Sequence, residues 1–252
     1  MRLVWHGTAS IEIICSSGRI LFDPFVPLKG SDTDVRPEDF DGFTDIFVTH
    51  GHLDHIASIP EIVARNPSAV VWCTRTPFRT LSRKGVPKSS LRRIGYRQEL
   101  SVGGFRVTVF HARHAVLPRV SLSRAAAVLR SAHRGNLPYI LREHIRCREN
   151  DETVLYLIEA DGQSISLMGS LNLRDDVEYP VGSDLLVLPY NGWEDNLPPA
   201  VRVIERLKPE RVLLDHFDDT FPPITVPIDL SPVLRRYGGL AAPMKPGKAE
   251  EI

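Results

Sequence analysis

Three histidines and an aspartate lie within six consecutive positions, at His50, His52, Asp54 and His55. Alternating residues on an extended loop project to the same side, so His50 and His52 can hold one cation. Asp54 and His55 lie close enough to reach a second cation. Imidazole and carboxylate ligands suit Zn²⁺, Mn²⁺ or Fe²⁺. The alternative is a polar surface loop, but the run directly follows a β-branched strand pattern and the chain has nine histidines in all.

Two later histidines could complete such a site. His114 follows a strand pattern over residues 105–110 and is the natural third ligand of the first cation. His111 competes for that role, and two residues three positions apart are not expected to face the site together. His216 follows an apolar run and is the natural late ligand of the second cation. A lone histidine at a strand end is more often structural, and the early run is what favours ligation here.

Short apolar runs separated by turn residues predict alternating strands and helices. Strands are expected at 10–15, 19–22, 45–49, 69–73, 105–110, 154–159, 164–168, 184–189 and 211–215. Helices are expected at 59–65, 77–84 and 199–207. The histidine run therefore lies at the carboxyl end of a buried strand, where sites in α/β sheets usually form. The tail after Gly238, with its prolines and charged end, is predicted to be loosely ordered.

The middle of the chain is basic. Residues 118–150 are predicted to form a helical insertion or cap, with amphipathic helices between two core strands. Its guanidinium groups could bind a phosphate or carboxylate, could form the solvated face of the helices, or could belong to a homo-oligomer contact. The segment has only two acidic residues, Glu143 and Glu149. Its arginines are Arg119, Arg124, Arg130, Arg134, Arg142, Arg146 and Arg148.

The overall composition is that of an ordinary globular protein: 252 residues, 42% hydrophobic, 25% charged, and a formal net charge of zero. No global field points to nucleic acid or to an acidic membrane surface, although a local patch can hide inside a neutral total. Cys15, Cys73 and Cys147 form no CxxC pair, which fits a reducing compartment. Neither a signal-peptide pattern nor an apolar stretch of roughly 18 residues is found, so a cytoplasmic location is expected.

The run Thr49-His50-Gly51-His52-Leu53-Asp54-His55 resembles the THxHxDH signature of the metallo-β-lactamase superfamily. Further segments, among them Ala112-Arg113-His114 and Asp215-His216-Phe217, are similar to the branch that contains the ascorbate-6-phosphate lactonase and related uncharacterised metal-dependent hydrolases. The resemblance covers residues 1 to about 225. It implies an α/β fold, a four-layer αββα sandwich with a helical basic insertion, and a single domain over residues 1–252.

The resemblance also implies the ligands of two metal ions. The first ion would take His50, His52 and His114, and the second would take Asp54, His55 and His216. The family bridges both ions with an aspartate, and Ser170 stands in the corresponding place here. Two divalent cations within roughly 3.5–4 Å repel strongly and depend on bridging anions. The second site is therefore predicted to be weak or empty, with one or two ions per chain.

Two smaller departures accompany Ser170. Asp175 or Asp176 could replace the missing carboxylate by moving into the site. Thr8 occupies a position where some relatives have histidine, and His6 is displaced from it by two positions. We do not expect His6 to contribute to the site.

The chemistry implied is attack by a metal-bound hydroxide, with Asp54 orienting the water and accepting its proton. Asp23, at a strand end, is expected either to hold the histidine loop or only to cap its strand. The residues Tyr190, Asn191 and Trp193 are candidates for the substrate pocket.

The predicted substrate is a small anionic ester, lactone or phosphodiester, with no nucleic-acid partner expected. The alternatives are a nuclease and a non-catalytic metal or ligand binder. The first is disfavoured by the zero net charge, and the second is favoured by the loss of the bridging aspartate.

Overall fold

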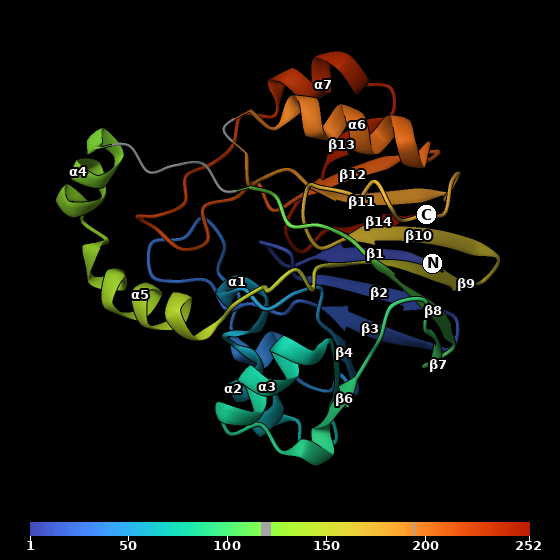
Figure 1. Ribbon diagram of the computed structural model, residues 1–252, viewed down its shortest axis with the longest axis horizontal. Helices are drawn as coiled ribbons and strands as arrows, with labels where there is room; N and C mark the ends of the chain where they lie inside the picture. The colour runs from blue at the N-terminus through green and yellow to red at the C-terminus, as the bar shows by residue number, and fades with distance from the viewer. Residues whose placement is uncertain (117–121, 194) are drawn as a thin grey trace.

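The structure is a computed structural model that describes residues 1–116, 122–193 and 195–252, with side chains 122–125 also outside the description. In this described part, two seven-stranded sheets lie face to face, and helices cover the outer face of each sheet (Figure 1). The first four predicted insertion residues, 118–121, fall outside the described residues. No helix among those described is long and apolar enough to cross a membrane.

The first sheet begins with an antiparallel hairpin and continues with parallel strands. Its strands β1, β2 and β3 pair antiparallel, and β3 to β6 pair parallel. In spatial order the strands are β14 (Ala249–Glu251), β1 (Arg2–Trp5), β2 (Ile11–Cys15), β3 (Gly18–Phe22), β4 (Asp45–Phe47), β5 (Val70–Cys73) and β6 (Leu91–Arg93).

The second sheet has the same mixed character. Its strands β7 to β10 pair antiparallel, and β10 to β13 pair parallel. In spatial order the strands are β13 (Ala241–Pro243), β12 (Val212–Asp215), β11 (Leu185–Pro189), β10 (Gln163–Met168), β9 (Val154–Ala160), β8 (Phe105–His111) and β7 (Glu99–Val102).

The helices divide between the two outer faces, and the pair α4 and α5 forms a separate lobe at the left of Figure 1. The α-helices are α1 (Leu53–Ile56), α2 (Ile59–Arg65), α3 (Arg75–Arg83), α4 (Leu122–Arg130), α5 (Leu137–Arg146), α6 (Leu197–Leu207) and α7 (Ser231–Tyr237). Short 3₁₀ turns are η1 (Pro37–Phe40), η2 (Lys88–Ser90) and η3 (Arg134–Asn136).

Three apolar clusters explain the layers. The largest lies between the two sheets and contains Trp5, Phe22 and Tyr156. A second cluster packs the first sheet against α1, α2 and α3, and a third packs the second sheet against α6 and α7. Each sheet buries both faces, which is why β11 is apolar at every position and β12 at every position except its last, Asp215. The predicted αββα sandwich is confirmed.

One prediction about the fold is wrong. The tail after Gly238 is not loosely ordered: β13 pairs with β12 in the second sheet, and β14 pairs with β1 in the first. Each of these strands has three residues and is mostly exposed, so neither carries an apolar period that a sequence reading could detect. Backbone pairing with a distant strand edge, rather than side-chain burial, holds the tail in place.

Candidate metal centre

The strand β4 delivers the histidine run between the two sheets. Past its end, the Val48 carbonyl accepts a hydrogen bond from the Tyr156 hydroxyl at 2.6 Å, and the Thr49 carbonyl accepts one from the Val154 amide at 3.0 Å. Both donors belong to the second sheet, so the loop is tied to both sheets before its first histidine. His52 is still extended (φ −73°, ψ 162°) and precedes the single turn α1, which carries Asp54 and His55.

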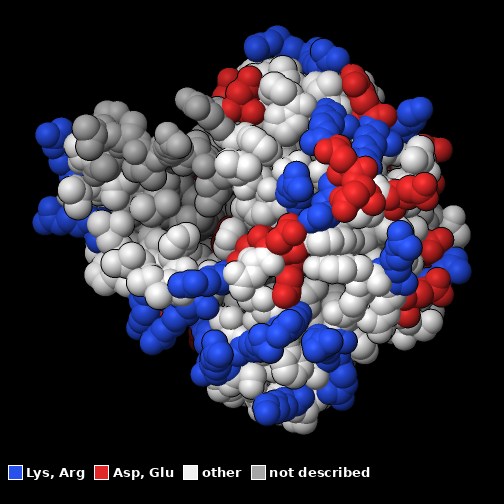
Figure 2. All heavy atoms as spheres, viewed as in Figure 1, with Lys and Arg blue, Asp and Glu red and all other residues white. Residues whose placement is uncertain are grey.

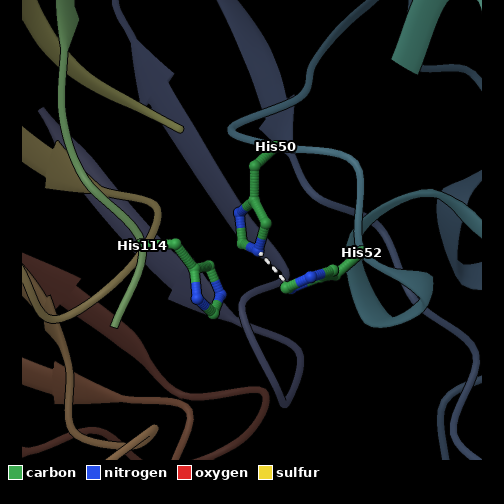
Figure 3. Close-up of side chains that lie close together, drawn as sticks. All are labelled: His50, His52 and His114. Atoms are coloured by element: carbon green, nitrogen blue, oxygen red, sulfur yellow. Dashed lines mark hydrogen bonds between the residues drawn. The ribbon is translucent and has the colours of Figure 1, made fainter. Parts of the chain in front are cut away.

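Three imidazoles converge in a first cluster. His50 Nε2 lies 3.2 Å from His52 Nδ1, and the His114 ring centroid lies 4.8 Å from that of His50 and 4.4 Å from that of His52. One ring nitrogen from each residue lies within 4.8 Å of the others. In Figure 3 the three rings point toward one another, two from the histidine loop and one from the segment after β8.

The surroundings keep this first cluster neutral. Burial, reinforced by the neighbouring imidazoles, holds the pKa of His50 well below its usual value. Burial and His114 lower the pKa of His52 to about 4, and burial lowers that of His114. Neutral imidazoles offer free lone pairs, which is the state a metal ion requires. The donor set therefore fits a cation such as Zn²⁺.

A carboxylate and two imidazoles form a second cluster. Ligand atoms of Asp54, His55 and His216 lie within 4.8 Å of one another. The Asp54 Oδ2 atom is 3.1 Å from His216 Nε2 and 3.7 Å from His55 Nε2. His216 Nδ1 is buried and has no hydrogen-bond partner among the described residues. This set also fits a divalent cation.

Charge distinguishes the second cluster from the first. Burial opposes ionisation of Asp54, but His55 and His216 hold its pKa well below its usual value. Burial also opposes protonation of His216, but its hydrogen bond and charge interaction with Asp54 raise its pKa to about 9. Without a cation this cluster is therefore an ion pair, and a cation that binds there must displace the proton of His216.

Of the two alternatives for Asp23, its hydrogen bonds favour the one in which it holds the histidine loop. Its Oδ1 accepts the Thr49 amide at 2.8 Å, and its Oδ2 accepts the Thr49 hydroxyl at 2.5 Å. The same Oδ2 lies 2.8 Å from His55 Nδ1, which leaves His55 Nε2 to face the second cluster. A carboxylate behind a histidine of this kind fixes the ring's orientation and tautomer.

Ser170 lies at the end of the second sheet and supports the loop that carries His114. Its buried hydroxyl accepts the Ala115 amide at 3.0 Å, and the neighbouring Asn172 side chain donates to the His114 carbonyl at 3.2 Å. Neither predicted replacement carboxylate reaches the clusters. Exposed Asp175 pairs with Arg202 at 2.5 Å, and exposed Asp176 pairs with Arg174 at 3.1 Å.

The three residues predicted to line the substrate pocket differ in their burial and contacts. The interpretation of Tyr190 as a pocket wall is wrong, because its side chain is 1% exposed and packs within the third apolar cluster. Trp193 Nε1 donates to the Leu171 carbonyl at 2.8 Å, and Asn191 Oδ1 accepts the Gly192 amide at 2.7 Å. Both are partly exposed. Their role in binding a substrate stays a prediction.

The two other histidines considered from the sequence, His111 and His6, lie outside the clusters. His111 Nε2 bonds to the Asp151 carbonyl at 2.8 Å and its ring stacks on Tyr96 with centroids 4.0 Å apart. His6 Nε2 lies 3.3 Å from Glu12. As expected, His114 rather than His111 turns inward, and His6 does not take part.

The sequence reading missed two supports of the site. A Cβ atom on Gly51 would lie 2.1 Å from the Arg148 carbonyl oxygen, so the end of the insertion rests directly on the histidine loop. Asp218 accepts the Thr8 amide at 2.9 Å, and the Thr8 carbonyl accepts the His216 amide at 3.0 Å. A glycine between two histidines was a signal for the first support. Nothing local indicated the second.

Comparison with known proteins places this geometry in a family. Residues 18–217 match the family described as the Beta-lactamase superfamily domain, and the chain belongs to it. It is 29% identical over 247 residues to a UPF0173 metal-dependent hydrolase of Desulfitobacterium hafniense, covering 94% of this chain and 91% of that protein. It is 24% identical to one of Sulfolobus acidocaldarius, covering 100% and 99%.

Solved structures agree on the fold. A metallo hydrolase of Ignicoccus hospitalis, Igni18, superposes with a TM-score of 0.66 at 17% identity, covering 100% of this chain and 98% of that one. Zn²⁺-bound PqqB of Methylobacterium extorquens superposes with a TM-score of 0.62 at 15% identity, covering 100% of both. The predicted superfamily is confirmed, and so is the predicted enzyme class, a metal-dependent hydrolase.

Proposed function

We propose that this enzyme hydrolyses a small anionic ester, lactone or phosphodiester, using one or two divalent cations held by the two clusters. The observation that carries the proposal is the convergence of six potential ligand atoms in two groups, each within 4.8 Å. The first ion, Zn²⁺ or alternatively Mn²⁺ or Fe²⁺, would be held by His50, His52 and His114. The second would be held by Asp54, His55 and His216, and Ser170 makes this second site the weaker one.

A cation of this kind, when bound, lowers the pKa of its coordinated water and polarises a carbonyl or phosphoryl oxygen. The chain's own groups would do the rest. Asp54 stays ionised because His55 and His216 face it, so its Oδ2 can orient a water and accept a proton. Asp23 and Thr49 hold the rings of the histidine loop in place. Asn191 and Trp193 are the proposed substrate contacts.

We also propose that residues 1–252 form one domain in which segment 118–150 is a cap. Its helix α5 is anchored to the body because buried Glu143 pairs with Lys84 of the turn after α3. At the other end, Asn136 Nδ2 donates to the Lys29 and Pro222 carbonyls at 3.0 and 2.7 Å. These contacts connect the proposed cap to the end of α3 and to the loops that carry Lys29 and Pro222. The three free thiols support a reducing, cytoplasmic compartment.

The test is turnover of a panel of simple phosphodiesters, esters and lactones by protein supplied with Zn²⁺ or Mn²⁺, with metal content measured on the same preparation. We expect turnover that disappears on chelation and returns with metal. The matched control is His111→Ala, which removes a histidine outside both clusters and should leave activity intact. A metal-loaded protein that is inert on every substrate, with a ligand-binding response instead, would favour the non-catalytic alternative.

A further inference from the structure

A basic face lies on the outer side of the first sheet, over α3, η2 and β6. Six cationic side chains are exposed there: Arg75, Arg79, Arg83, Lys88, Arg92 and Arg93. None of the six forms an ion pair with an acidic residue in the described ranges. Figure 2 shows Lys and Arg gathered on this lower part of the molecule with no Asp or Glu among them. The chain's zero net charge conceals this face.

Many exposed arginines elsewhere on the surface are paired, although others, such as Arg97 and Arg235, form no ion pair with a described residue. Arg65 binds Asp41 at 2.7 Å and Arg174 binds Asp151 at 2.9 Å, and further pairs involve Arg202 and Arg211. On the basic face, in contrast, like charges repeat at every fourth position of α3, a spacing that destabilises a helix slightly. No ion pair to these arginines in the described fold offsets this cost, although the Glu152 carboxylate accepts bonds from Thr76 in the first turn of α3. The arrangement therefore points to a ligand that supplies the negative charge.

A groove in this face indicates what kind of ligand fits. Phe78, Arg79, Ser82, Arg83 and Lys88 line it, so three cations and a hydroxyl share the groove with a partly buried aromatic ring that also packs against the second apolar cluster. Cations and hydroxyls bind phosphate oxygens, and an aromatic ring stacks on a base without regard to sequence. A purely acidic peptide would make no use of the ring, and a lipid surface would require protruding apolar side chains, which the lining lacks.

The cations also form a row longer than one phosphate. Arg75, Arg79 and Arg83 lie four residues apart on α3, so successive side chains stand about 6 Å apart along the helix. The row starts beside the histidine loop, because Pro77 Cγ lies 3.6 Å from where a Cβ on Gly51 would be. Arg92 and Arg93 extend the charge onto β6. A linear ligand with repeated charges matches this row better than a single anion.

We propose that this basic face binds single-stranded nucleic acid, with phosphates along the arginine row and a base stacked on Phe78. The surface is separate from the two metal-ligand clusters, so binding does not depend on a loaded metal site. The proposal also does not depend on hydrolysis, and a protein that binds strands without cleaving them satisfies it.

The test is binding of a fluorescently labelled 12-nucleotide single strand to the full chain, measured by anisotropy at several salt concentrations. Each phosphate neutralised on a single strand contributes about −0.7 to the slope of log K against log salt. The triple variant Arg79→Gln/Arg83→Gln/Lys88→Gln should therefore show a slope shallower by about 2 and at least ~10-fold weaker binding at low salt. Phe78→Leu, which keeps an apolar side chain, should weaken binding about tenfold with the slope unchanged.

The matched control removes the same charge elsewhere. The variant Lys208→Gln/Arg235→Gln/Lys245→Gln changes three exposed cations outside the basic face and should bind as the unmodified chain does. The His50→Ala variant should also keep full binding, which separates this proposal from the proposed hydrolysis. Circular dichroism confirms that each variant is folded.

Any of the following results would overturn the proposal: equal salt slopes for the two triple variants, equally tight binding of polyglutamate, or binding confined to vesicles of anionic lipid. A mononucleotide that competes as well as the 12-mer on a nucleotide basis would also overturn it, because the arginine row would then be unused.

Discussion

The two ligand clusters share one loop but differ in charge. His50, His52 and His114 form a neutral set, and burial keeps protons off all three rings. Asp54 and His216 form an ion pair, and the Asp54 carboxylate raises the pKa of the His216 imidazole to about 9, so that this ring keeps its proton at neutral pH. The first cluster is therefore prepared for a cation, whereas the second must exchange a proton for one. This difference shows that six ligands of suitable types do not form two sites that are equally ready to bind a cation.

Their supports differ as well. The second cluster is fixed from behind by the Asp23 carboxylate, which lies 2.8 Å from His55 Nδ1. The first depends on neutral contacts: the Ser170 hydroxyl and the Asn172 amide hold the His114 loop, and the Arg148 carbonyl rests on Gly51. Charge thus supports one cluster and close packing supports the other.

Removal of one ligand from each cluster gives the largest expected effect. We expect His50→Ala to lower kcat/KM by about 10³-fold and to release tightly held metal, since a lost cation costs several kcal/mol of transition-state stabilisation. His216→Ala should lose less metal, because we propose that its cluster is the weaker of the two metal sites. Metal content and kcat/KM measured on both variants check this. A metal-free His216→Ala beside a metal-loaded His50→Ala would reverse the ranking of the clusters.

Asp23→Asn tests the carboxylate support. The variant keeps the size of the side chain but loses its charge and one acceptor for the Thr49 and His55 donors. Metal affinity should fall by about 10- to 100-fold, mainly at the second cluster. Competition with a fluorescent chelator measures the change. Asp184→Asn removes a carboxylate that accepts two bonds from Ser164, and it should leave metal affinity unaltered.

Ser170→Asp should make the metal affinities of the two clusters more nearly equal. An added carboxylate would reduce the repulsion between two cations, so the second equivalent should bind at least ~10-fold more tightly. Isothermal titration of metal-free protein measures both equivalents. Ser170→Ala, which only removes the bond from the Ala115 amide, should keep the original stoichiometry. Two equally tight ions in the unmodified chain would contradict the predicted weakness of the second site.

Gly51→Ala tests the packing support of the first cluster. The new Cβ would lie 2.1 Å from the Arg148 carbonyl oxygen, so either the histidine loop or the cap must shift. We expect a loss of about 1–3 kcal/mol in the free energy of unfolding, as for other overpacked sites. Thermal melts with and without metal measure it. Gly135→Ala, with nothing within 4 Å of its Cβ position, serves as the control.

The anchoring of the cap should depend weakly on pH. Burial opposes ionisation of Glu143, but its bonds to Lys84 and Arg142 lower its pKa below 4.5. A group with a lowered pKa in the folded state stabilises it above its unfolded pKa and loses that contribution as the pH falls. Limited proteolysis of segment 122–148 should therefore accelerate below about pH 4.5. Glu143→Gln should be cleaved faster at neutral pH and should show little of this pH dependence.

The fold was largely readable from local pattern. The apolar runs predicted nine strands and three helices in the right places, because each buries a continuous face that its residues record. Strands β1, β6 and β7, helices α1 and α7 and the tail strands were not predicted. They are short, and β13 and β14 are held by pairing with strands more than 25 residues away in the sequence or at its other end. Such pairing leaves no local apolar period.

For the candidate site, the sequence by itself determined the ligand types. The spacing of the ligands between His50 and His55 places four donors within six positions. The sequence also showed Ser170 where the family has its bridging aspartate. The residues alone left His111 as a competitor of His114, and the family resemblance implied His114; in the structure His111 turns outward onto Tyr96.

The tertiary structure alone decided what surrounds those ligands. Tyr190 lies in the core instead of a pocket, and Asp175 and Asp176 are paired with arginines at the surface. The protonation states of the two clusters and the gathering of unpaired cations beside α3 are likewise invisible in a chain of zero net charge. The physical reason is common to all of these features. Ligand type is a property of single residues, whereas burial, charge pairing and close approach depend on segments that meet only when both sheets have formed.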